Sequence, residues 1–261
     1  GFSNPSTVYQ VLAGVKKRYL AGCSNVQSRE TQDRPSLPKR TRINERGLDK
    51  LAKLGTVREA ALFETLARDA VRCKLCERLC ALAPGELGNC KTRVNASGRL
   101  YTLVYGNLSV IESRPIEIKP FFHYWPGSTA LTFSTWSCNL DCPWCQNSSL
   151  SKTPPDTLNS RYYSPEEIVG MAVSYGDEGL CASFQEPTLL TEWAADVFSL
   201  ARRRGLYSCF VSNGYMTLDA LRFLADHGLD AIKFDVKGNS QTYKQYCGGV
   251  RGDEVVWRNA K

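Results

Sequence analysis

Short apolar runs alternate along the second half of the chain with longer segments in which apolar residues recur at helical spacing. The apolar runs predict four strands, over residues 129–135, 179–184, 207–212 and 231–236. The segments between them predict three helices, which begin at the Ser164 cap with Pro165 and Glu167, at Thr191 and at Thr217, the last two stopping at Gly205 and Gly228. Strands that alternate with helices of about ten residues predict an α/β fold with a parallel sheet or barrel.

A polar cluster follows each predicted strand. The clusters are residues 138–145, 185–187, 212–215 and 235–238. Because the catalytic groups of parallel α/β folds come from the carboxyl ends of the strands, we expect all four clusters to face one mouth. Taken singly, each cluster is also typical of a turn, and Ser-Asn-Gly at residues 212–214 is an ordinary turn sequence.

The composition narrows the chemistry that these clusters can perform. The 261 residues suffice for one large domain or two modest ones, and they hold 11 Cys but only 2 His. With only His123 and His227, a His-rich metal centre or a Ser-His-Asp triad is nearly excluded. No apolar run reaches the roughly 18 residues of a membrane span, and the N-terminus lacks the apolar stretch of a signal peptide. We therefore expect no membrane association and a reducing cytoplasm rather than a disulfide scaffold.

The net charge of +7 lies in the N-terminal extension. Residues 1–58 hold 12 Lys and Arg against 4 Asp and Glu, whereas the rest of the chain holds 21 against 22. A basic arm can bind nucleic acid or an acidic partner, but without interleaved aromatic residues the pattern favours a solvated linker. The predicted domains are residues 1–57, a basic extension and linker, residues 58–125, a Cys-rich metal-binding module, and residues 126–261, a partial barrel.

Cys138, Cys142 and Cys145 form a C-x3-C-x2-C motif directly after the first predicted strand. Three thiolates from one loop can hold three irons of a cubane cluster, which leaves the fourth iron open to a substrate or cofactor. The alternatives are a zinc site without its fourth ligand and a set of structural thiols. The position of the motif at the start of the strand and helix series favours the cluster.

Four further cysteines form a second motif with the spacing C-x2-C-x3-C-x9-C, at Cys73, Cys76, Cys80 and Cys90. Four thiolates can close a tetrahedral zinc site or hold a second iron-sulfur cluster with no open position. The spacing does not decide between these two, and two disulfides are a third option in an oxidising compartment. The other cysteines are predicted to be small buried hydrophobic residues, at Cys23, Cys181, Cys209 and Cys247.

C-x3-C-x2-C with an aromatic residue, Trp144, before the last cysteine resembles the signature of radical S-adenosylmethionine (SAM) enzymes. The resemblance narrows to the radical SAM member of the AmmeMemoRadiSam system, itself similar to pyruvate formate-lyase activating enzyme. It rests on residues 115–120, 123–127, 138–147, 186–188, 212–216 and 235–238. The four-cysteine motif, within residues 71–93, also has a counterpart there. The resemblance covers about residues 58–261 and leaves out the basic extension.

This resemblance implies a [4Fe-4S] cluster whose unique iron binds the amino and carboxylate groups of SAM. One electron then cleaves SAM to methionine and a 5′-deoxyadenosyl radical, which abstracts hydrogen from a substrate. The electron implies a donor such as ferredoxin or flavodoxin. Similarity to an activase suggests a protein or peptide substrate, but a small molecule or a modified RNA base is equally allowed. A radical SAM barrel usually has about six strand and helix units, and the sequence shows four, so we expect its C-terminal part to be missing.

The resemblance also assigns roles to the polar clusters. Glu186 would accept a hydrogen bond from the SAM amino group, although it could instead be an acidic residue at a helix N-terminus. The other residues implied in SAM binding are Trp144, Gln185, Ser212, Asn213, Asp235 and Lys237. Gln185 stands where the family commonly has Asn, and Lys237 suits pairing with a carboxylate.

Two functions follow from these observations. The first is a radical SAM enzyme, and the alternative is a metal-stapled protein that binds nucleic acid through its basic arm. Polar residues gathered at strand ends favour the enzyme, because a binding module would not need them there.

Overall fold

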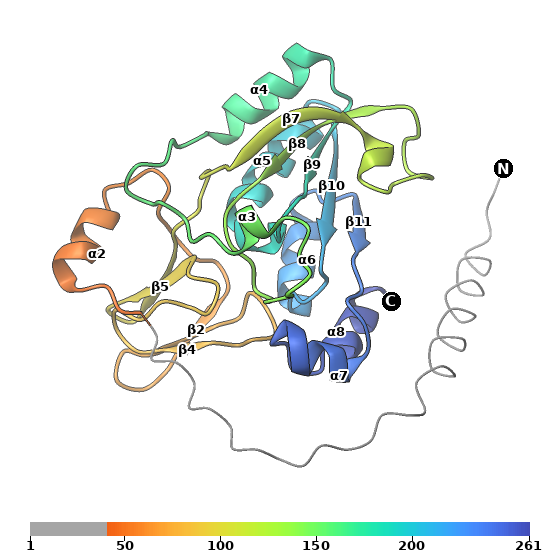
Figure 1. Cartoon of the computed structure of the whole chain (residues 1–261). Coiled ribbons are helices and arrows are strands. Elements are labelled where there is room, and N and C mark those ends of the chain that lie inside the picture. Colours follow the sequence, from red (N-terminus) through yellow and green to blue (C-terminus); the bar gives the residue numbers. More distant parts are fainter. Residues whose placement is uncertain (1–40) are drawn as a thin grey trace, which may run out of the picture. The chain divides into compact units, whose positions relative to one another are not determined.

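The computed structural model describes residues 41–261, which are drawn in colour in Figure 1 and belong to one compact unit. Cys23 and most of the predicted basic extension lie outside the described residues, and so does most of the predicted nucleic-acid-binding arm. The domain boundaries predicted at residues 57 and 125 stay predictions. Within the part that the structure describes, no helix is long and apolar enough to cross a membrane.

A five-stranded sheet forms the centre of the fold, with the strand order β11-β10-β9-β8-β7. The strands are β7 (Val110–Pro115), β8 (Thr129–Ser134), β9 (Gly179–Ala182), β10 (Tyr207–Ser212) and β11 (Ala231–Phe234). β8 to β11 run parallel and side by side, as Figure 1 shows, and they match the four predicted strands. The predicted α/β class with a parallel sheet is therefore confirmed.

β7 is the strand that the sequence pattern missed. It pairs antiparallel with β8 at the edge of the sheet, and none of its six residues is buried. An edge strand needs no apolar run, so its polar sequence carries no strand signal. Among the described residues the sheet keeps two free edges, β7 and β11, and the predicted partial barrel stays a prediction.

Three helices connect the parallel strands: α4 (Pro165–Tyr175), α5 (Thr191–Arg203) and α6 (Leu218–Asp226). Ser164 caps α4 by accepting a hydrogen bond from Glu167 N at 3.1 Å, as predicted. The Glu167 carboxylate pairs with Arg161, so the second half of the expected capping box does not form. Thr217 caps α6 in the same way, because its hydroxyl accepts from Ala220 N at 3.1 Å.

The two faces of the sheet differ. One face packs large side chains against the helices, with Phe133 edge-on to Trp193 at 5.1 Å and Phe198 edge-on to Phe210 at 5.5 Å between ring centroids. The other face carries a smaller cluster, formed by Ala130, Cys181, Tyr207 and Cys209 with Ile116 and Phe121 from the loop after β7. That loop therefore folds back across the face that the helices leave uncovered.

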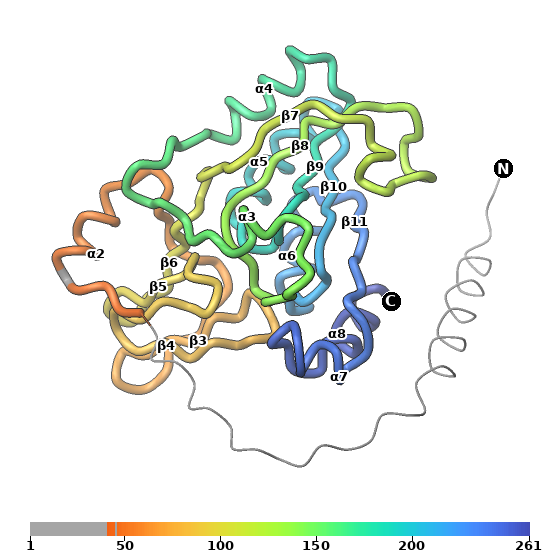
Figure 2. The backbone as a smooth tube through the Cα atoms, viewed as in Figure 1, coloured from red at the N-terminus to blue at the C-terminus, as the bar shows by residue number. Residues whose placement is uncertain are grey.

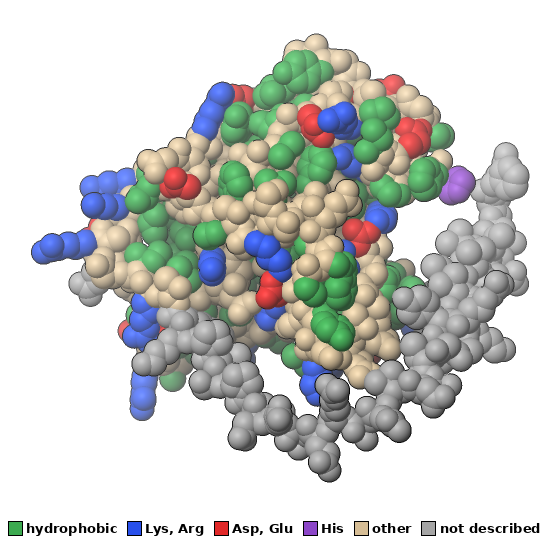
Figure 3. Space-filling model, viewed as in Figure 1, with side chains coloured by type: hydrophobic (Ala, Val, Ile, Leu, Met, Phe, Trp, Pro, Cys, Tyr) green, Lys and Arg blue, Asp and Glu red, His purple; other side chains and the backbone are tan. Residues whose placement is uncertain are grey.

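The N-terminal part of the described chain forms two small antiparallel sheets. One contains β1 (Arg58–Glu59), β6 (Arg99–Thr102) and β5 (Arg93–Ala96), and the other contains β2 (Phe63–Thr65), β3 (Val71–Cys73) and β4 (Ala81–Leu82). Helix α2 (Glu45–Leu51) precedes them, and Figure 3 shows Lys and Arg side chains projecting at the edge that it forms. Figure 2 traces the chain from these sheets into β7.

Short helical segments complete the chain. α3 (Ser148–Ser151) follows the three-cysteine loop, and 3-10 turns span Ile116–Ile118 and Pro187–Leu190. The C-terminal segments are α7 (Ser240–Thr242), a π-helical turn Tyr243–Cys247 and α8 (Gly252–Asn259). Their buried residues pack with Leu140 and Cys142, so the C-terminal end supports the three-cysteine loop from one side.

A buried ion pair joins the N-terminal sheets to the central sheet. Arg93 on β5 donates two hydrogen bonds to the Glu192 carboxylate on α5, at 2.7 and 2.8 Å, and a third to the carbonyl of Leu189 at 3.1 Å. The side chains of Arg93 and Glu192 are only 1% and 9% exposed. Removing one member of such a pair leaves the other charge buried without compensation.

We expect Glu192→Gln to lower the free energy of unfolding by about 3–5 kcal/mol, because Arg93 then stays buried without its counter-charge. Glu64→Gln is the matched control, since Glu64 pairs with Arg72 at 2.6 Å but both side chains are more than 40% exposed. Its loss should stay below about 1 kcal/mol. Urea unfolding measures both, and equal losses would contradict the role given to the buried pair.

Candidate active site

A cavity of about 580 Å³ lies at the carboxyl ends of the parallel strands. Its wall includes residues from all four clusters that were expected at one mouth, namely Cys138, Cys142, Trp144, Cys145, Gln185, Glu186, Asn213, Asp235 and Lys237. Ser212 stands behind the wall and donates a hydrogen bond to Glu186 at 2.8 Å. The volume lies within the range of about 300–1,000 Å³ that is usual for sites binding small molecules and cofactors.

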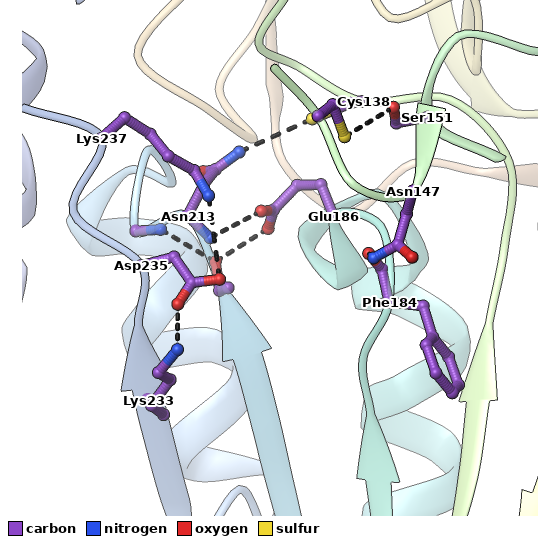
Figure 4. A network of polar contacts seen from close by, with 12 residues as sticks. Cys138, Asn147, Ser151, Phe184, Glu186, Asn213, Lys233, Asp235 and Lys237 are labelled. Carbon is purple, nitrogen blue, oxygen red and sulfur yellow. Dashed lines mark hydrogen bonds and ion pairs between the residues drawn. The ribbon is translucent and has the colours of Figure 1, made fainter. Parts of the chain in front are cut away.

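Glu186 is the centre of the polar network in this cavity (Figure 4). Its carboxylate is 1% exposed and accepts from Ser212 Oγ and from Asn213 N, both at 2.8 Å. It also accepts from the backbone N–H of Thr188 at 3.0 Å and from the Thr188 hydroxyl. Burial raises the pKa of Glu186, and these donors offset part of that rise.

The contact with Thr188 N makes Glu186 the N-cap of the 3-10 turn Pro187–Leu190. The alternative role of an acidic residue at a helix N-terminus is therefore realised in the structure. It does not remove the carboxylate from the cavity wall, where the predicted contact with SAM stays a prediction.

Asn213 links Glu186 to the three-cysteine loop. Its side-chain amide donates to Asn139 Oδ1 at 2.7 Å and lies 3.7 Å from Cys138 Sγ. Its side-chain oxygen accepts from the backbone N–H of Tyr215 at 2.9 Å. The ends of β9 and β10 and the start of the cysteine loop thus form one hydrogen-bonded unit.

The three cysteines of the loop share the cavity without forming a disulfide. Burial raises the pKa of Cys138 to about 12, and the charge of Glu186 adds to that rise. Cys145 Sγ lies 3.1 Å from the hydroxyl of Ser151 on α3. Three thiols lining a cavity of this size fit a cluster, in which each thiolate binds a different iron.

Among the described residues, no three Cys, His, Asp or Glu side chains converge as ligands of one metal ion. This holds for the three-cysteine loop and for the four-cysteine motif alike.

Asp235 and Lys237 line the opposite side of the cavity and form an ion pair with each other at 3.7 Å. Lys233, on β11, also pairs with Asp235, as Figure 4 shows. Lys237, which was expected to pair with a carboxylate of the ligand, therefore pairs with the carboxylate of Asp235 in the structure. Trp144 stands at the rim, 51% exposed, and packs against Tyr246 with 6.0 Å between ring centroids.

Sequence patterns missed three groups of this cavity. Asn139 stands inside the cysteine motif but was not singled out, although its amide oxygen holds Asn213. Lys233 lies within β11, and only the alternation of side chains between the two faces of a strand could have indicated that it faces the cavity. Lys119 lies within residues 115–120, which carry part of the resemblance, but the resemblance gives it no role and does not predict that it lines the cavity.

The four-cysteine motif gathers around a separate and much smaller cavity, of about 10 Å³. Cys73, Cys76, Cys80 and Cys90 all line it, and none of them forms a disulfide. Arg93 lines it as well, and the Nε of Arg93 is buried without a hydrogen-bond partner. Burial raises the pKa of Cys73 to about 12, while the Arg93 charge lowers it in part.

The segments around the four-cysteine motif contact two of the loops that form the larger cavity. Arg78 hydrogen-bonds to the carbonyl of Asn139 in the cysteine loop, and Ser137 Oγ donates to the carbonyl of Cys90 at 2.7 Å. Cys76 forms a backbone bridge with Met216, just after the Asn213 turn. The four-cysteine segment is thus a direct structural support of the candidate site.

Two comparisons relate this architecture to known proteins. Residues 134–261 match the model of the Radical SAM superfamily. The chain is also 37% identical, over 191 residues, to the uncharacterized protein MJ0808 of Methanocaldococcus jannaschii. That alignment covers 73% of this chain and 56% of the relative, so the chain spans little more than half the length of the protein it matches.

The matched region begins at the end of β8 and contains the three-cysteine loop, Glu186, Asn213 and Asp235, the residues that the cavity brings together. The family implies a [4Fe-4S] cluster and SAM, and the three thiols of the cavity are a donor set that fits them. Residues 134–261 are thus similar to the Radical SAM superfamily, and this likeness supports a radical SAM interpretation of the cavity.

Proposed function

We propose that the large cavity binds a [4Fe-4S] cluster and SAM and that the protein cleaves SAM reductively to abstract hydrogen from a substrate. The observation that carries the proposal is the meeting of Cys138, Cys142 and Cys145 with Glu186 and Asn213 on the wall of one cavity of about 580 Å³. When bound, the cluster and SAM supply a 5′-deoxyadenosyl radical, as the radical SAM family implies.

The residues of this chain have distinct tasks in the proposal. The three loop thiolates bind three irons, and the absence of a fourth thiol from the loop leaves one iron for SAM. Glu186 accepts a hydrogen bond from the backbone N–H of Asn213, and the two residues would present a carboxylate and a side-chain amide to SAM. Asp235, Lys237, Ser212 and Trp144 complete the pocket. The Glu186 carboxylate, already bound by neutral donors, stays in place without a ligand, so little reorganisation accompanies binding.

Three finer assignments belong to the same proposal. The motifs of the large cavity support a position near the radical SAM member of the AmmeMemoRadiSam system. A one-electron donor such as ferredoxin or flavodoxin would reduce the cluster in a reducing cytoplasm. A protein or peptide would be the substrate by analogy with an activase.

We further propose that Cys73, Cys76, Cys80 and Cys90 bind one zinc ion. The support is that all four thiols line one small cavity, where four thiolates can close a tetrahedral zinc site. The thiols do not converge on one point among the described residues, so binding would require them to move together. Arg93 lines the same cavity and its charge lowers the pKa of Cys73 in part, while its main counter-charge is the Glu192 carboxylate.

Cys142→Ala should abolish the formation of 5′-deoxyadenosine from SAM and dithionite under anaerobic conditions, because the loop then holds at most two irons. Cys209→Ala is the matched control, since Cys209 is buried in the sheet on β10 and does not line the cavity. Chromatographic detection of 5′-deoxyadenosine gives the answer. A Cys142→Ala protein with full activity would remove the three-cysteine loop from the mechanism.

Glu186→Gln should weaken SAM binding by about 10- to 100-fold, since a hydrogen bond to a charged group contributes about 1.5–3 kcal/mol. The amide would also set an N–H₂ group against donors that now meet a carboxylate. Glu166→Gln, on the exposed first turn of α4, should bind SAM as the unmodified protein does. Equilibrium dialysis with labelled SAM measures both, and equal affinities would exclude Glu186 from the SAM site.

Metal analysis of two reciprocal variants separates the two cysteine groups. Cys76→Ala should lose zinc and keep the iron of the cluster, whereas Cys142→Ala should lose iron and keep one zinc per chain. Each variant is thus the control for the other after anaerobic reconstitution. About eight irons per chain and no zinc in the unmodified protein would show that the four-cysteine group holds a second cluster instead.

A further inference from the structure

Cys142 is the cysteine of the three-cysteine loop whose thiol meets another thiol. Cys138 Sγ and Cys145 Sγ have a side-chain amide nitrogen and a hydroxyl oxygen as neighbours, at 3.7 and 3.1 Å. The Cys142 thiol instead shares a hydrogen bond with the thiol of Cys247, and neither residue belongs to a disulfide in the structure. Cys247 lies outside both cysteine motifs, and the proposed function gives it no role.

The C-terminal segment holds Cys247 against the loop through its backbone as well. The backbone N–H of Asp141 donates to the carbonyl of Cys247 at 2.9 Å, and Cys142 packs with Cys247 in one buried apolar cluster. Cys247 ends the π-helical turn that begins at Tyr243, and Gly248 follows it with a positive φ of 66°. Turns of this type are frequent at functional sites. Backbone contact and packing therefore place the two cysteines together, in addition to the contact between their thiols.

The two thiols differ in their access to small molecules. Cys142 lines the large cavity and is 8% exposed, whereas Cys247 is fully buried and does not line it. Burial raises the pKa of the Cys247 thiol to about 12, and the hydrogen bond with Cys142 adds to that rise. A small oxidant that enters the cavity therefore meets Cys142 first, with a second thiol directly behind it. A sulfenic acid that forms beside a thiol condenses with it to a disulfide.

Another pair of neighbouring cysteines lacks this access. Cys181 on β9 and Cys209 on β10 stand opposite each other in the register of the parallel strands. Both are fully buried, and neither lines the large cavity. The combination of a neighbouring thiol with access from the cavity thus distinguishes Cys142 and Cys247, and the pair in the sheet is an internal control.

We propose that Cys142 and Cys247 form a reversible disulfide when the chain lacks its cluster and meets a peroxide. The thiolate is the form of cysteine that binds metals, so this bond withdraws Cys142 from the cluster ligands. It also stops oxidation of Cys142 short of the irreversible sulfinic acid. The protection of a cluster ligand rests on the proposed function, whereas the disulfide itself does not.

The reaction balances with hydrogen peroxide as the oxidant. The Cys142 thiol loses its proton and attacks one peroxide oxygen, the O–O bond breaks, and the second oxygen leaves as water with that proton. Cys142 is then a sulfenic acid. The Cys247 sulfur attacks Cys142 Sγ, the S–O bond breaks, and the hydroxyl leaves as water with the Cys247 proton. Two thiols have lost two electrons, and one peroxide has become two waters.

The first test is peptide mapping of the full chain, prepared without iron and treated with hydrogen peroxide. Tandem mass spectrometry under non-reducing conditions should find a cross-link between Cys142 and Cys247, and dithiothreitol should return both to thiols. Cys181 and Cys209 should stay thiols throughout. A disulfide between Cys142 and any other cysteine overturns the proposal, and so does a Cys142 that ends as a thiol or a sulfinic acid.

The second test removes the buried thiol. In Cys247→Ala and in Cys247→Ser, peroxide should carry Cys142 to the sulfinic acid, which dithiothreitol does not reverse. Cys209→Ala is the matched control, and its Cys142 should return to the thiol as in the unmodified protein. A Cys142 that dithiothreitol fully restores in both Cys247 variants would show that Cys247 gives no protection.

Iron analysis and SAM cleavage separate this role from the proposed function. Without peroxide, Cys247→Ala or Cys247→Ser should bind as much iron as the unmodified protein after anaerobic reconstitution, because Cys247 is not a cluster ligand. Loss of iron from both variants would make Cys247 part of the cluster site and overturn the proposal. A disulfide between Cys142 and Cys247 in a protein that forms no 5′-deoxyadenosine would reject the proposed function and leave the disulfide standing.

Discussion

The buried carboxylate of Glu186 sets the geometry on which the candidate site depends. It comes at the end of β9, yet it accepts hydrogen bonds from Ser212 and Asn213 at the end of β10. Asn213 in turn holds Asn139 of the cysteine loop, which follows β8. A buried carboxylate without such donors would be costly, so the fold is stable only when these three strand ends stand in register. The hydrogen bonds that satisfy the Glu186 carboxylate therefore also position the side chains that are proposed to bind SAM.

The four-cysteine segment reinforces this arrangement from the outside. Arg93 reaches the carbonyl of Leu189, in the 3-10 turn that Glu186 caps, while Arg78 and Cys90 contact the cysteine loop. Each of these contacts joins parts of the chain that are far apart in sequence. A metal ion that draws four thiols together would restrain all of them at once, which gives the four-cysteine group a mechanical role in the site without any part in the chemistry.

The elements that could be predicted from sequence are those with local signals. Ser164 and Thr217 cap their helices through their own side chains, and the apolar runs of β8, β9 and β10 are largely buried on both faces. The residues of the polar clusters were found by the rule for strand ends. β7 and Lys119 could not be found, because β7 depends on pairing with β8 and Lys119 on a loop that folds across the sheet. Such placements are set by tertiary packing and leave no periodic trace.

Two of the cysteines outside the motifs explain how the loop after β7 can lie directly on the sheet. Cys181 and Cys209 point away from the helices, on the same face as Ala130, and all three are fully buried. Leu180 and Phe210, their neighbours in sequence, pack on the helix side. Small residues on one face let Ile116 and Phe121 lie directly on the sheet, and this carries Lys119 inward to the cavity. Bulkier side chains at Cys181 or Cys209 would displace the loop, so the size of these residues, and not their thiol chemistry, determines where the loop lies.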